Sequence, residues 1–339
     1  MTTLDPVSGA ADPVKTAAPA ALPPITATAT AVAVAPTEHK SEPGTEPKEV
    51  SGGGKGPTRA PGFRPAWDPF TIAGVALGLV VALLGGFVLY LATVSDFQQA
   101  RTQRRLFDRI SEDFYNAVGP LGGDIKEGTP IAILDIPSID LRQVVVEGTT
   151  ADQLRAGPGH LRNTSLPGGF GNSVLMGKRW SYGAPFGDID RLKAGQKIQV
   201  TTQQGQFTYV VRDEMHVDKG DDDVIAPGGG HRLTLVTADS WVRPDGRTVV
   251  VADLQGQFEV AEPGRTRTVG DEEKGTSGEA GAGMALLLWA QAFALVCGVM
   301  AWALRRYNRR ITLTLGAPTT IAVLWALYDN ASRLLPATL

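Results

Sequence analysis

Residues 70–94 contain no charged side chain, which restricts this segment to a membrane or to a large protein core. About 25 helical residues at 1.5 Å each cross the roughly 30 Å of hydrocarbon in a bilayer. Trp67 before the run and Tyr90 near its end are aromatic residues of the kind found at the two interfaces. Two further apolar runs cover residues 284–304 and 311–327. The sequence therefore predicts three transmembrane helices.

The short loop between the last two runs predicts the orientation of the chain. It holds four arginines within six residues, Arg305, Arg306, Arg309 and Arg310. Lysine and arginine are enriched in cytoplasmic loops, so this loop is expected inside the cell. A multi-pass protein of the plasma membrane follows, with residues 128–255 outside and residues 1–66 inside.

Composition predicts the state of the first 66 residues and excludes several functions. The segment is rich in Ala, Pro, Thr and Gly, which favours a disordered tail. A net charge of −3 without a basic patch argues against nucleic-acid binding. Cys297 is the only cysteine, and the four histidines have no ligand spacing, so no metal or other cofactor is expected.

Residues 128–255 have the signals of short strands separated by Gly and Pro. Alternating apolar and polar residues predict an all-β domain of about 130 residues, a barrel or a sandwich. The clearest pair is 233–238 and 247–252, joined by a loop at 239–246. The predicted strands are 131–136, 142–146, 173–176, 197–202, 207–212, 232–237 and 248–254.

The segment Leu233-Thr234-Leu235-Val236-Thr237-Ala238 resembles the T-L-x-T-C strand of the sortases, which are cysteine transpeptidases. Residues 177–186 read G-K-R-W-S-Y-G-A-P-F and are similar to G-H-R-x-x-Y-G-A-P-F of the actinobacterial class E sortases. This resemblance implies a sortase-like β-barrel.

The resemblance also implies a catalytic triad that this chain does not keep. Ala238 stands at the family's cysteine, Lys178 stands at its histidine, and only Arg247 is retained. A sortase attacks its substrate with the cysteine thiolate, and an alanine has no nucleophile. The chain is therefore expected to be a pseudoenzyme with no catalytic residues, acting as a binding or scaffold subunit of a membrane complex in the cell envelope.

Three alternatives concern what the site does. In one, Ser240 and Lys178 form a serine-lysine pair for acyl transfer. In another, the groove binds a peptide or an anionic envelope group; in the third, the barrel is vestigial and its aromatic residues are core. The expected partners are membrane or cell-envelope proteins. The residues predicted to line the groove are Lys178, Arg179, Tyr182, Trp241 and Arg247.

The resulting domain organisation ends in a short extracytoplasmic tail. Within it, residues 335–338 read Leu-Pro-Ala-Thr, the L-P-x-T pattern of a sorting signal, and the hypothesis is that they cap the groove of their own or a neighbouring chain. The predicted segments are a disordered tail 1–66, transmembrane helix 67–95, amphipathic stalk 96–127, sortase-like barrel 128–255, linker 256–282, transmembrane helix 283–304, basic hairpin 305–310, transmembrane helix 311–328 and tail 329–339.

Overall fold

The computed structural model describes residues 68–339 except 121, 219, 241–244, 257–267 and 280. The predicted disordered tail, residues 1–66, lies outside the described residues, as do Trp241 and part of the predicted linker. Three helices in the described part of the chain are long and apolar enough to cross a membrane.

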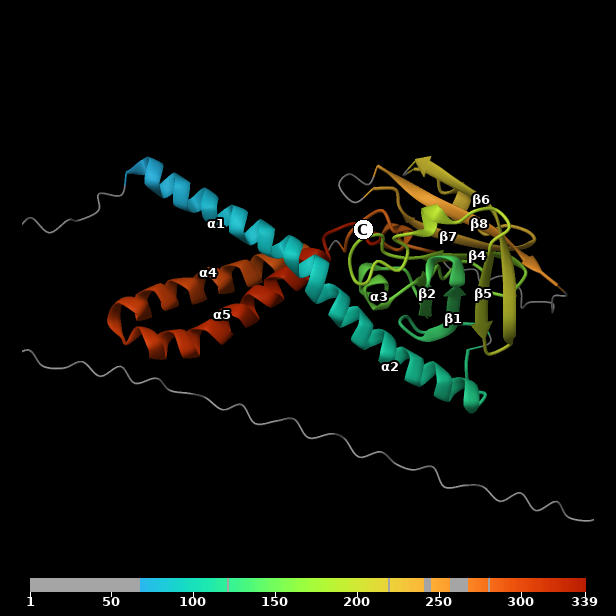
Figure 1. Cartoon of the computed structure of the whole chain (residues 1–339), viewed down its shortest axis with the longest axis horizontal. Helices are drawn as coiled ribbons and strands as arrows, with labels where there is room; N and C mark the ends of the chain where they lie inside the picture. Colours follow the sequence, from blue (N-terminus) through green and yellow to red (C-terminus); the bar gives the residue numbers. More distant parts are fainter. Residues whose placement is uncertain (1–67, 121, 219, 241–244, 257–267, 280) are drawn as a thin grey trace, which may run out of the picture. The chain divides into compact units, whose positions relative to one another are not determined.

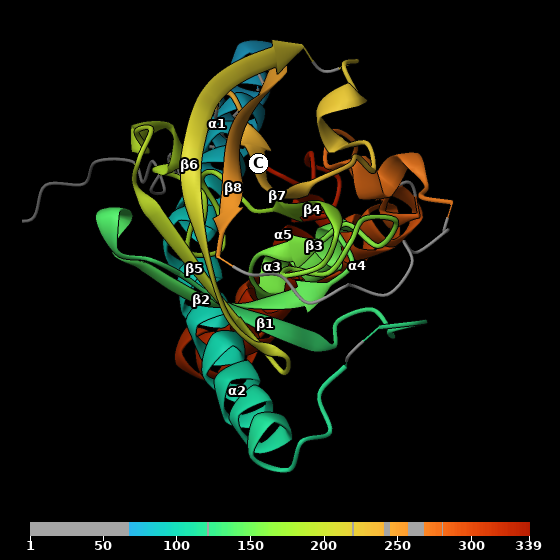
Figure 2. The same ribbon diagram turned by 90° about the vertical axis from the view of Figure 1, so that its right-hand side faces the viewer.

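Eight strands form a closed barrel in the order β1-β2-β3-β4-β7-β8-β6-β5 (Figures 1 and 2). Most neighbours are antiparallel, but β2 pairs with β3 and β4 pairs with β7 in parallel. The strands are β1 Pro130–Ile136, β2 Leu141–Glu147, β3 Gly159–His160, β4 Gly171–Met176, β5 Lys197–Thr202, β6 Gly205–Asp218, β7 His231–Ala238 and β8 Gly246–Gln255.

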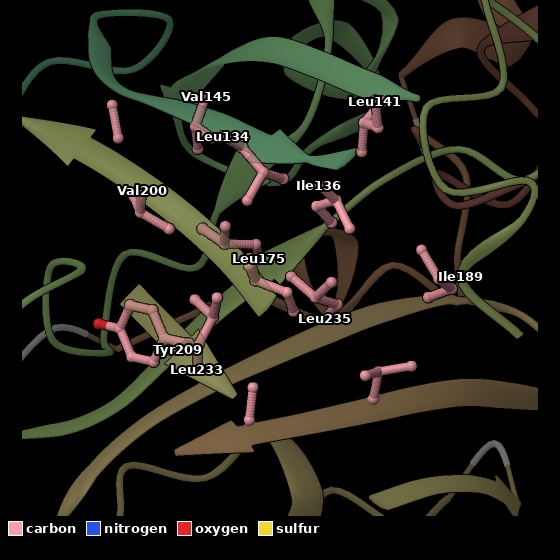
Figure 3. Close-up of a cluster of buried hydrophobic side chains, with 14 of the residues drawn as sticks. Leu134, Ile136, Leu141, Val145, Leu175, Ile189, Val200, Tyr209, Leu233 and Leu235 are labelled. Carbon is pink, nitrogen blue, oxygen red and sulfur yellow. The ribbon is translucent and has the colours of Figure 1, made fainter. Parts of the chain in front are cut away.

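The inward-facing side chains of these strands form the main hydrophobic core. Leu134 on β1, Leu175 on β4 and Leu235 on β7 are completely buried, and Figure 3 shows them among other aliphatic side chains. Tyr209 on β6 lies in the same cluster and accepts a hydrogen bond from the Gly168 backbone at 2.7 Å. Burial raises the pKa of its hydroxyl to about 12. The apolar positions of the predicted strands therefore fill the barrel.

The prediction of an all-β domain is confirmed, and the domain is a barrel, not a sandwich. Each of the seven predicted strands is present, with ends that differ by a few residues. Strand β6 is the largest difference, because it continues to Asp218 where the prediction ended at 212. Strand β3 was not predicted, since its two residues are too few to show alternation.

One continuous helical run leads from the first apolar segment to the barrel. Helix α1 (Pro69–Leu89) passes through a π-helical segment (Tyr90–Val94) into α2 (Ser95–Tyr115). The buried Gln103 on α2 donates to the carbonyl oxygens of Val144 and Ala156 and accepts from the Val144 N–H. The predicted stalk is thus a helix docked on the barrel by hydrogen bonds.

The other two long helices form an antiparallel hairpin, labelled α4 and α5 in Figure 1. Helix α4 spans Ala282–Arg306, and α5 spans Arg309–Ser332. The Asn308 side chain caps α5 by accepting from the Arg310 N–H at 3.0 Å. Helix α5 extends past the predicted apolar run as far as Ser332, so less of the chain remains for the predicted tail.

Candidate functional site

Three of the predicted site residues lie at one edge of the barrel because of how three strands pair. Strands β4 and β7 are parallel, so their carboxyl ends share this edge, and β8 starts there as the antiparallel partner of β7. Lys178 follows β4, Ala238 ends β7, and Arg247 is the second residue of β8. Ala238 and Arg247 are direct register partners.

Arg247 is buried and its guanidinium is held by several acceptors. One terminal nitrogen donates to the Asp221 carbonyl oxygen at 3.1 Å, and both donate to an Asp222 carboxylate oxygen at 3.2 Å. The second nitrogen also donates to the Lys274 carbonyl oxygen at 3.2 Å. Burial alone would raise the pKa of Asp222, but hydrogen bonds from Lys274 and Arg247 outweigh it and lower that pKa. Arg247 therefore lies in a fixed, charge-paired position.

Lys178 is 2% exposed, which is unusual for a lysine. Its ammonium nitrogen lies 5.5 Å from the centroid of the Tyr182 ring. Burial, and then the positive charge of Arg155, lower the pKa of Lys178 to about 7. Near neutral pH the lysine thus divides between its charged and neutral forms.

Arg179 ties the loop after β4 to its neighbours. Its guanidinium donates to an Asp190 carboxylate oxygen at 2.7 Å and to the Ala238 carbonyl oxygen at 3.2 Å. Ala238 itself is 1% exposed, and a methyl group is all that its side chain offers to the site. Ser240, the predicted alternative nucleophile, follows β7 and is half-buried.

Tyr182, which the sequence predicted to line the groove, packs against two helices. It is 2% exposed, and its hydroxyl lies 2.9 Å from the hydroxyl of Ser332 at the end of α5. Its backbone N–H donates to the Ser95 hydroxyl on α2 at 2.9 Å. The Arg155 guanidinium lies 4.9 Å from the Tyr182 ring. Tyr182 thus joins the site loop to the ends of two helices.

His160 lies inside the fold. It is completely buried on β3, and its Nδ1 is 3.0 Å from a Glu147 carboxylate oxygen. Its Nε2 is 2.9 Å from the Ser165 carbonyl oxygen.

Residues 335–339 lie on the chain's own site, where one form of the tail hypothesis placed them; the C label in Figure 1 marks this end. The Thr338 carbonyl oxygen accepts from the Arg179 N–H at 2.9 Å. The Leu339 carbonyl oxygen accepts from the Trp180 N–H at 3.2 Å and from the Ser181 N–H and hydroxyl. The tail thus contacts the loop that follows β4 in its own chain.

Two contributors to the site were missed by the sequence analysis. Residues 274–277, assigned to a linker, lie between Arg247 and the tail, where the Gly275 carbonyl oxygen accepts from the Thr338 N–H. Arg155 on α3 (Ala151–Ala156) approaches the Tyr182 ring and pairs with Asp329. Neither segment has a sequence motif that points to the site.

Comparison with known proteins shows which protein family this barrel resembles. Residues 134–255 match the family model of the sortase domain. Sortase D of Bacillus subtilis (strain 168) is 29% identical over 158 residues, which cover 44% of this chain and 78% of that protein. The putative sortase YwpE of the same organism is 30% identical over 73 residues, 22% of this chain and 72% of that protein.

The chain is also similar to a solved structure of a sortase E. Sortase E from Streptomyces avermitilis is 32% identical and matches 39% of this chain and 91% of that one, with a TM-score of 0.36. The barrel is a sortase domain, and the described part of the chain also contains three helices long and apolar enough to cross a membrane. The chain belongs to the sortase family.

Proposed function

We propose that this chain is a catalytically inactive sortase homologue that binds its ligand or partner at the cell envelope, as a scaffold subunit of a membrane complex. One observation carries the proposal: Ala238 ends β7 directly opposite Arg247. In the family this strand end carries the thiolate, and a methyl group can neither attack a carbonyl nor hold an acyl group. Arg247 can still bind a peptide carbonyl or an anionic group.

The first test is a transpeptidation assay on the purified full-length chain. LPxTG and LAxTG peptides with an amine acceptor are expected to remain intact, as followed by mass spectrometry. Cleavage by the unmodified chain would overturn the proposal. Affinity purification in mild detergent then identifies the partner proteins.

Restoring the thiol alone should not restore the reaction. The Ala238→Cys variant is expected to cleave the peptides at least 100-fold more slowly than an active sortase assayed beside it, because proton transfer by a positioned group typically contributes about 10²–10⁴-fold. Lys178 is buried beside Tyr182, so we do not expect it to transfer protons in place of the family's imidazole. Turnover at the rate of the active sortase would contradict this account of Lys178. The matched control is Thr237→Cys, one residue earlier on the opposite face of β7.

A second function is favoured by the lowered pKa of Lys178, about 7. A neutral lysine can accept a proton, so Lys178 could activate a serine hydroxyl such as that of Ser240 for acyl transfer. This alternative predicts slow cleavage of the peptides that is lost in Ser240→Ala. If the unmodified chain and Ser240→Ala give the same trace of product, the acyl-transfer function is excluded.

A further inference from the structure

Two separate pieces of the chain form one hydrogen-bonded unit on the site, here called the C-terminal strap: residues 274–277 and 335–339. The Thr338 N–H donates to the Gly275 carbonyl oxygen at 3.2 Å, and its hydroxyl donates to the same oxygen at 2.8 Å. The Ala337 N–H donates to the Ser277 carbonyl oxygen at 3.2 Å. A Cβ on Gly275 would lie 2.7 Å from the Thr338 methyl, so only glycine permits this close approach.

The strap is also packed into the barrel domain by its side chains. Ala337 is completely buried in an apolar cluster that includes Leu154 and Val236. Leu335 packs against a second cluster around Tyr182. Thr338 and Leu339 are 4% and 8% exposed. Backbone pairing and apolar burial together hold the strap as a bound peptide would be held.

One contact of the strap occupies the retained arginine of the site. The Lys274 carbonyl oxygen accepts from a terminal nitrogen of Arg247 at 3.2 Å. On the other side, the backbone N–H groups of Arg179, Trp180 and Ser181 all donate to carbonyl oxygens of the strap. An added peptide cannot use these donors while the strap holds them.

The strap is tied to both helices of the α4–α5 hairpin. The Glu279 N–H, shortly before α4, donates to the Arg333 carbonyl oxygen just after α5 at 2.9 Å. Ser332 at the end of α5 bonds to Tyr182 of the site loop, and Asp329 pairs with Arg155. The base of the hairpin and the strap thus form a connected set of contacts on the barrel.

We propose that the C-terminal strap is a tethered peptide that competes for the site, which opens to an extended peptide only when the strap leaves together with the base of the α4–α5 hairpin. This inference rests on the proposed binding function and adds its regulation. A tethered segment acts at an effective concentration of about millimolar, so a free peptide with similar contacts competes poorly. Movement of the hairpin in the membrane would then control access to Arg247.

The test compares two arginine substitutions in the full-length chain in detergent micelles. Ala337→Arg places a large charged side chain in a fully buried position and should release the strap. Leu334→Arg introduces the same side chain at a position that is 41% exposed, so the strap should stay bound. If Ala337→Arg does not fold, as judged by circular dichroism and gel filtration, deletion of residues 335–339 replaces it.

Two measurements separate the strap from the binding function. Hydrogen exchange of the backbone N–H groups of residues 179–181 should be at least tenfold faster in Ala337→Arg and unchanged in Leu334→Arg. A fluorescent Leu-Pro-Ala-Thr-Leu peptide should bind Ala337→Arg at least tenfold more tightly than the unmodified chain, as measured by anisotropy.

Each outcome has one meaning. Unchanged exchange in Ala337→Arg and in the deletion overturns the strap. Equal peptide binding with and without a bound strap overturns the competition but leaves the binding function intact. If exchange at residues 179–181 is faster in Ala337→Arg but no variant binds the peptide, the strap does cover the site. The site is then not a peptide-binding site.

Discussion

Lys178 shows how one buried side chain makes stability depend on pH. Burial lowers its pKa from 10.5 to about 7, so between these values the unfolded chain holds a proton that the folded chain releases. The free energy of unfolding therefore rises with pH over this window, by up to about 1.4 kcal/mol per pH unit. Below pH 7 both states are protonated and the full cost of burying the charge remains.

Lys178→Met should remove this cost. At pH 6 the variant is expected to have a larger free energy of unfolding than the unmodified chain. This difference should become smaller as the pH rises towards 10. Thermal unfolding in detergent micelles, followed by tryptophan fluorescence, measures the difference at each pH. Lys193→Met, at an exposed lysine, is the control and should track the unmodified chain. A Lys178→Met difference that is constant from pH 6 to 10 would contradict the buried titration.

At the scale of elements, one buried amide makes three of the hydrogen bonds that dock α2 on the barrel. Gln103→Ala leaves the Val144 N–H and the carbonyl oxygens of Val144 and Ala156 without their partner. Unpaired buried groups of this kind cost about 1–3 kcal/mol each, reduced where water enters, so a loss of about 3 kcal/mol in unfolding free energy is expected. Denaturant unfolding in micelles provides the measurement. The control is Arg104→Ala, because Arg104 follows Gln103 on α2 and is exposed. It should change the free energy of unfolding by less than about 0.5 kcal/mol.

The sequence predicted the strands well because alternation is a local signal. Strand β7 forms where the alternation places it, but both of its faces are buried, with Leu235 in one core cluster and Val236 in another. The pattern could not predict that β3 pairs with both β2 and β4, because two residues have no period. Nor could it place residues 274–277 on the site, since their charged and glycine-rich composition is also that of a linker.

The site was predicted in its positions but not in its surroundings. Lys178, Ala238 and Arg247 meet at one edge because the parallel pairing of β4 and β7 brings them there, as the family resemblance implied. Tyr182 was assigned to the groove, whereas Ser332 and Ser95, distant in sequence, hold it against the helices. Such contacts between residues distant in sequence depend on tertiary packing, which a short sequence pattern cannot predict.

At the scale of the whole molecule, the arginine-rich loop predicts which side of the membrane each part occupies. Single cysteines in a Cys297→Ala background test this orientation with a membrane-impermeant maleimide. Gln204→Cys in a barrel turn should be labelled in intact cells, while Tyr307→Cys in the loop should react only after permeabilisation; both positions are exposed. The reverse pattern would contradict the positive-inside assignment.

The unbroken run from α1 into α2 also limits how far from the bilayer the site can work. The 21 residues of α2 span about 32 Å, and the barrel is fastened along this helix by Gln99 and Gln103. A flexible linker would let the barrel sample a wide volume, but a docked helix acts as a rigid post. With α1 in a bilayer, the site would therefore stay within about the length of α2 of the lipid surface. A ligand anchored in the same membrane would be confined to the same layer as the site.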